Sequence, residues 1–179
     1  MKAIDLTNVK EAGDFSRPAP GAYICTIKKV EDNTEKEYLM ITFDITEGDY
    51  AGYYDQLRED HPDWSDPGLY YRSYRSTALG FFKRFCSAVS KSNPGFNFDG
   101  QTNADEKTLA GKKIGLVLRE EEYYGNDGEK KTRLKVDKEF AIADIGKQKV
   151  PECKRIIEES KPSEFLNVPD AVGDSVPWS

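Results

Sequence analysis

Tyrosine and arginine residues alternate in a segment, residues 67–98, that has no acidic residue although the whole chain carries a net charge of −6. Tyr70, Arg72 and Tyr74 are spaced two apart there, so a β-strand would send all three to one face. Aromatic rings stack on bases, and guanidinium groups pair with phosphates. The pattern indicates binding of single-stranded nucleic acid. The alternative is a solvated edge strand with half-buried tyrosines.

A second group of alternating cations follows a hairpin signal, Gly-Asn-Asp-Gly, at residues 125–128. We expect one strand from 112 to about 124 before this turn and a return strand over 130–140. One face of the return strand is then cationic, and Tyr123 and Tyr124 flank the turn. The alternating cations are Lys131, Arg133 and Lys135.

Nothing in the chain has the spacing of a metal or catalytic site. Cys25, Cys86 and Cys153 are far apart, and His61 is the single histidine, so we expect no zinc and no disulfide. We expect Cys25 and Cys86 to be packed as small apolar residues. No P-loop, G-x-S-x-G or Cys–His motif is present. We therefore expect no metal, no cofactor and no enzymatic activity.

Acidic residues offer a weaker catalytic alternative. Asp44, Glu47 and Asp49 resemble a magnesium-binding cluster, as in a nuclease. Strand alternation points Asp44 away from the core, however, and no lysine or histidine follows at a persuasive spacing.

Local patterns predict three strands, one helix and two further strands. The first strand runs from Gly21 to about Glu31 and the second over 37–46, where apolar and polar residues alternate cleanly. The third, over 69–74, runs into a helix over 76–90 that Ser76 caps and Asn93-Pro94-Gly95 ends. We expect this helix to dock on the sheet through Leu79, Phe82, Cys86 and Val89.

This order of elements is that of the OB-fold, a five-stranded Greek-key barrel. The OB-fold binds oligonucleotides on its second and third strands and on the loops after its first and fourth strands. The cations and tyrosines noted above coincide with these places. The predicted nucleic-acid-binding residues are Lys36, Tyr38, Tyr70, Arg72, Tyr74, Arg75, Tyr123, Tyr124, Lys130, Lys131, Arg133 and Lys135.

The connection over residues 48–68 is long and rich in tyrosine and aspartate. Its tyrosines and Trp64 are possible stacking platforms, but its carboxylates would repel phosphate. We therefore favour a structural cover for the core.

The chain divides into an N-terminal arm (1–20), an OB-fold domain (21–145) and a C-terminal part (146–179). A short helix around Pro151 to Glu159 is expected, followed by a disordered acidic tail. The last 22 residues carry a net charge of −4, which leaves the body nearly neutral. We find no signal peptide and no apolar run of membrane-spanning length, so we expect a cytoplasmic protein.

Six segments together carry a resemblance: Phe15–Tyr23, Glu37–Leu39, Tyr71–Tyr74, Phe81–Phe85, Ser92–Phe96 and Glu121–Gly128. They resemble a family of uncharacterised proteins from phages and prophages of Gram-positive bacteria. The resemblance implies a single-stranded DNA-binding role in phage replication or recombination, in the cytoplasm of the bacterial host.

The end of the chain is similar to the acidic tail of bacterial single-stranded DNA-binding proteins, although it has fewer acids and an extra Ser179. The resemblance implies docking to replication or recombination proteins, with an apolar tip in a pocket and acids around it. A frayed terminus is the alternative. The matching residues are Asp170, Asp174, Val176, Pro177 and Trp178.

The leading hypothesis is thus a non-catalytic protein that binds single-stranded DNA by tyrosine stacking and phosphate contacts. The alternative is an adaptor or inhibitor that binds a host DNA-processing enzyme through the same barrel and the acidic loop over residues 49–66. A homodimer is also considered, because one barrel offers few contacts.

Overall fold

The structure is a computed structural model that describes residues 17–65 and 67–157. Most of the expected N-terminal arm and the whole acidic tail, with Asp170, Asp174, Val176, Pro177 and Trp178, lie outside the described residues.

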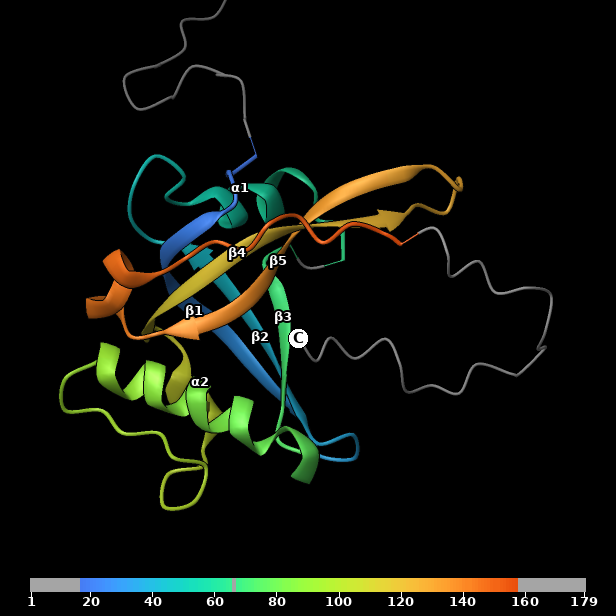
Figure 1. Ribbon diagram of the computed structural model, residues 1–179. Coiled ribbons are helices and arrows are strands. Elements are labelled where there is room, and N and C mark those ends of the chain that lie inside the picture. The colour runs from blue at the N-terminus through green and yellow to red at the C-terminus, as the bar shows by residue number, and fades with distance from the viewer. Residues whose placement is uncertain (1–16, 66, 158–179) are drawn as a thin grey trace, which may run out of the picture.

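Five antiparallel strands form one sheet in the order β3-β2-β1-β4-β5. Figure 1 shows α2 at one end of this sheet and α1 at the opposite end. The mainly β class and the helix after the third strand are confirmed. The strands are β1 (Gly21–Asn33), β2 (Tyr38–Ile45), β3 (Leu69–Ser73), β4 (Lys113–Tyr124) and β5 (Lys130–Phe140).

Alternating apolar residues place one face of the sheet in the core, as the sequence predicts. Ile27 on β1 pairs with Phe43 on β2, and both are almost fully buried. On the other side of β1, Cys25 pairs with Ile114 of β4. Cys25 and Cys86 are both buried, as expected, and burial raises the pKa of both thiols.

The helix after β3 begins later than its predicted cap. Residues Ser76–Ala78 form a 3-10 turn, η1, and α2 spans Leu79–Ser92. The N-cap residues of η1 and α2 are Arg75 and Ala78 rather than Ser76, and neither makes a side-chain capping hydrogen bond. The middle and last turns of α2 face the core, so Phe85 is fully buried whereas Leu79, at the start of the helix, is 52% exposed. Leu79 was therefore wrongly placed in the core, and Phe85 was missed.

The long connection between β2 and β3 contains a helix, α1 (Tyr53–Asp60). Tyr54 packs edge-on against Phe43, with ring centroids 5.0 Å apart. The buried carboxylate of Asp44 accepts a hydrogen bond from the Tyr54 backbone N–H at 2.9 Å, and burial raises the pKa of Asp44. This part of the connection thus covers the core, and Asp44 holds the start of α1.

The helix expected near residue 151 is absent from the described part of the chain, which continues to residue 157. A short 3-10 helix, η3 (Ile142–Lys147), lies just before this position in the chain. β4 extends past the residues that pair with β1, and Lys154 pairs with this free part of its edge. The Lys154 N–H donates to the Glu120 carbonyl, and the Lys154 carbonyl accepts from the Glu122 N–H. An open strand edge that offers backbone hydrogen bonds outweighs the local helix signal. None of the described helices is long and apolar enough to cross a membrane.

Two glycines should respond in opposite ways to alanine. A Cβ on Gly115 would lie 2.3 Å from the buried ring of Phe140, whereas one on Gly80, in α2, meets nothing within 4 Å. We expect Gly115→Ala to lower the free energy of unfolding by about 1–3 kcal/mol through overpacking. Gly80→Ala should raise it by up to about 1 kcal/mol. Urea denaturation measures both, and equal effects would contradict this packing.

Candidate nucleic-acid interface

The outer face of β2 and β3 carries a pair of tyrosine rings. Tyr38 and Tyr71 have centroids 5.3 Å apart and lie nearly perpendicular, at 82°. Met40 pairs with Tyr71 across the strands, so it shares this face. Both tyrosines are half-buried, so part of each residue reaches solvent. The sequence indicated Tyr38 but missed Tyr71, because alternation was assigned to the wrong face of the third strand.

Tyr70 and Arg72 do share a face, as predicted, but that face points into the core. Their partners on β2 are Ile41 and Leu39, which are core residues. Tyr70 is 5% exposed and Arg72 is 4% exposed. The expectation that these two side chains lie at the surface is therefore wrong.

Arg72 is buried because it has an acidic partner inside the fold. Its guanidinium forms an ion pair with Glu139 of β5, whose side chain is fully buried. Arg84 of α2 reaches the same carboxylate, with Nε 3.5 Å from Oε2. We call Arg72, Glu139 and Arg84 the buried clasp, since they join β3, β5 and α2.

The end of β3 is tied to the turn between β1 and β2. The Tyr74 hydroxyl donates to the Asp32 carboxylate at 2.8 Å. Burial, and then the hydrogen bond to Asp32, raise the pKa of Tyr74 to about 12, so it is a neutral donor at pH 7. Arg75 Nε donates to the Lys36 carbonyl at 3.1 Å. The Lys36 side chain is exposed, whereas Tyr74 and Arg75 are half-buried.

The β4–β5 hairpin has a cationic face. Arg133 Nη2 and Lys135 Nζ lie 3.3 and 3.4 Å from Glu121 Oε2, and Lys154 Nζ lies 3.9 Å from Oε1. Burial raises the pKa of Glu121, but Lys135 and Arg133 outweigh it and the net shift is downward. Three cations around one carboxylate leave a surplus of positive charge. Arg133 also lies over the Tyr123 ring, 4.9 Å from its centroid.

The tip of the hairpin holds the remaining predicted residues. Lys131 lies on the same face as Tyr123 and forms an ion pair with Asp127. Lys130 lies opposite Tyr124 on the other face, 3.7 Å from a Glu122 carboxylate oxygen. Tyr124 is 55% exposed. The hairpin therefore places these residues at the surface, but in two sets on opposite faces.

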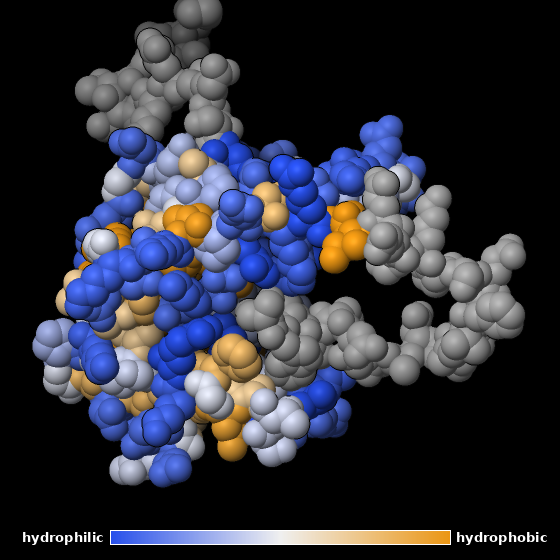
Figure 2. Space-filling model, viewed as in Figure 1, coloured by the Kyte–Doolittle hydropathy of each residue, from blue (hydrophilic) through white to orange (hydrophobic). Residues whose placement is uncertain are grey.

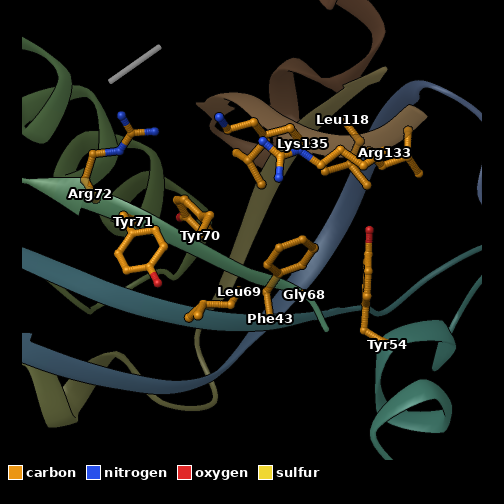
Figure 3. A pocket seen from close by; sticks show the side chains of 12 residues that line it. Phe43, Tyr54, Gly68, Leu69, Tyr70, Tyr71, Arg72, Leu118, Arg133 and Lys135 are labelled. Carbon is orange, nitrogen blue, oxygen red and sulfur yellow. The ribbon is translucent and has the colours of Figure 1, made fainter. Parts of the chain in front are cut away.

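The edges of β3 and β5 border a pocket of about 250 Å³. Figure 3 shows aromatic rings of Tyr70, Phe43 and Tyr54 on one side, and Arg133 and Lys135 from β5 on the other.

No protein-family model and no curated protein matches the chain. Neither comparison therefore assigns a function to the chain.

The two turns that carry predicted binding residues extend to the same side of the molecule. In Figure 1 the β1–β2 turn and the β4–β5 hairpin both extend to the right, below and above β3. Figure 2 shows a mainly hydrophilic surface in this view, with apolar side chains in small separate areas.

Proposed function

We propose that the protein is a non-catalytic single-stranded DNA-binding protein with an OB-fold. The strand order β3-β2-β1-β4-β5 and the helix after the third strand support this fold. The buried clasp would close the barrel by linking β3 to β5. The resemblance to phage and prophage proteins supports a role in phage DNA replication or recombination inside the bacterial host.

The observation that carries this proposal is the Tyr38–Tyr71 pair on the outer face of β2 and β3. Aromatic rings on this face suit base stacking, which tolerates any sequence. The surplus cations of the β4–β5 hairpin supply phosphate contacts. The exposed Lys36 adds a further cation in the β1–β2 turn.

Fluorescence anisotropy with labelled single-stranded and duplex oligonucleotides tests the proposal. We expect tight binding to single strands and weak binding to duplex. The logarithm of affinity should fall linearly with the logarithm of salt concentration, by about 0.7 per phosphate contacted. Absence of single-strand binding at low salt would refute the proposal.

A protein partner is the second candidate function. Trp64 is 53% exposed and stacks on His61, with centroids 3.9 Å apart. Exposed Trp is enriched in binding hot spots, and the acids around it, Glu59, Asp60 and Asp63, suit a basic target. A purified host DNA-processing enzyme that binds the protein equally with and without oligonucleotide, and loses binding on Trp64→Ala, would favour this function.

Removing the central carboxylate of the cationic face should strengthen DNA binding. Glu121→Gln leaves Arg133, Lys135 and Lys154 without their shared counter-charge. One unit charge about 4 Å away contributes about 1 kcal/mol in water, so affinity should rise about 5-fold. Anisotropy at fixed salt measures it. Glu47→Gln, whose carboxylate pairs with Lys113 away from the hairpin, is the control and should change nothing. Weaker binding of Glu121→Gln would contradict the role of this face.

A further inference from the structure

The pocket between β3 and β5 follows the edges of the two strands. It is lined by consecutive residues of both, 69–72 of β3 and 133–136 of β5. Consecutive residues belong to opposite faces of a strand, so the pocket opens along the edge rather than over one face. In the described part of the chain, these two edges are not hydrogen-bonded to each other. The pocket thus lies between the two outer edges of the sheet, β3 and β5, which the buried clasp links at one end.

The walls of the pocket differ in chemistry. Phe43 is in edge contact with both Tyr54 and Tyr70, at 5.0 and 5.8 Å between centroids, so three rings form one apolar wall. Arg133 and Lys135 form the facing wall (Figure 3). Flat rings favour a flat ligand, and cations favour a negative one.

The aromatic wall also holds a polar group that has no partner among residues 17–65 and 67–157. The Tyr70 hydroxyl is buried and makes no hydrogen bond to any of these residues. Burial raises the pKa of Tyr70 well above its ordinary value, so the hydroxyl stays protonated and able to donate. A buried hydroxyl is normally satisfied, because leaving it unpaired costs free energy. An acceptor atom on a ligand would remove this cost.

We propose that the pocket binds one nucleotide of the bound DNA strand. Its base lies against Phe43, Tyr54 and Tyr70, and its phosphate lies at Arg133 and Lys135. A volume of about 250 Å³ is below the usual 300–1,000 Å³ of pockets for larger ligands, so it suits one base. The inference rests on the proposed function. It adds a base-binding site beside the outer face of Tyr38 and Tyr71, and Tyr71 borders both.

Filling the pocket tests this directly. Leu134 lines it and is half-buried, so Leu134→Trp puts an indole into the space, whereas Leu134→Met keeps the volume nearly unchanged. We expect Leu134→Trp to bind single-stranded DNA about 5- to 150-fold more weakly, the range for one lost stacked base, and Leu134→Met to bind as the unchanged protein does. Thermal unfolding checks that both are folded.

A subtler variant keeps the packing. Tyr70→Phe removes only the unpaired hydroxyl, so folding stability should be unchanged or higher. DNA affinity should nevertheless fall about 2- to 10-fold, as for one lost hydrogen bond. If Leu134→Trp does not fold, this variant still decides, because a hydroxyl with no ligand would leave affinity unchanged.

Crosslinking identifies the residues that meet the base. A strand with iodouracil at each position in turn, irradiated with the full-length protein, should crosslink at one position to Tyr54 or Tyr70. Crosslinks to Tyr38 alone, with unchanged affinity of both pocket variants, would overturn the inference and leave DNA binding intact, whereas a crosslink to Tyr71 does not distinguish the two sites because Tyr71 also lines the pocket. Failure of the unchanged protein to bind any strand would instead overturn the proposed function. Thymidine monophosphate that binds as tightly as a strand would show a site for free nucleotides and would also overturn the inference.

Discussion

Glu139→Gln should lower the free energy of unfolding by about 3–5 kcal/mol. The substitution leaves the guanidinium of Arg72, which is 4% exposed, without a counter-charge in the core. Breaking a buried ion pair on one side has this cost because the remaining charge can neither reach water nor find another partner. Against a typical total of 5–15 kcal/mol, the loss is a large fraction of stability. Urea denaturation followed by fluorescence measures it, and an unchanged m-value would show that the unfolded state is unaffected.

Two control variants separate charge from packing. The double variant Arg72→Met with Glu139→Leu removes both charges and keeps apolar volume, so it should be close to the unchanged protein in stability or above it. Arg84→Met removes the partly exposed member, whose side chain is 39% exposed, and should cost less than Glu139→Gln. If Glu139→Gln lowers the free energy of unfolding by less than about 1 kcal/mol, the Arg72–Glu139 pair behaves as a solvent-exposed ion pair does. That result would contradict its burial in the core.

The buried clasp explains why the third strand was predicted on the wrong face. Alternation alone says that Tyr70 and Arg72 share a face, and it does not say which face meets the core. An arginine is almost never fully buried unless it is paired, so exposure was the reasonable expectation. Its partner, Glu139, lies on the last strand, and no local pattern connects the two. The tertiary pairing of β3 with β2 turns Tyr71 outward instead, beside Tyr38.

Local turn chemistry was predictable, whereas the charges around it were not. The Gly-Asn-Asp-Gly turn places β4 and β5 in an antiparallel hairpin whose return strand has the expected bounds, Lys130–Phe140. The cationic face of that strand is also as predicted. Its neutralising carboxylate was missed, because Glu121 lies opposite Arg133 only in the observed register. The part of β4 that does not pair with β1 has a free edge, and Lys154 pairs with it at Glu121. This pairing outweighs the helix that Pro151 predicts.

Replacing both rings of the outer face should remove most of the DNA affinity if this face stacks bases. Each stacked base contributes about 1–3 kcal/mol, so Tyr38→Ala and Tyr71→Ala should each weaken binding by about 5- to 150-fold. The double variant should lose less than the sum of the two free energies, because rings 5.3 Å apart share contacts with each other and with the same bases. Anisotropy on one labelled strand gives all three values.

The matched control for this face keeps the rings and removes the hydroxyls. Tyr38→Phe with Tyr71→Phe preserves the stacking surface, so affinity should stay within about 2-fold. The hydrogen bond that Asn33 Nδ2 donates to the Tyr38 hydroxyl is long, at 3.3 Å, so its loss should matter little. The alanine variants should also keep the salt slope of the unchanged protein, because no cation is removed. A changed slope with unchanged affinity at low salt would assign the tyrosines to folding of the β1–β2 turn rather than to the bases. Full affinity in the alanine double variant would place the DNA elsewhere on the protein, and the pocket between β3 and β5 would then have to bind its base without this face.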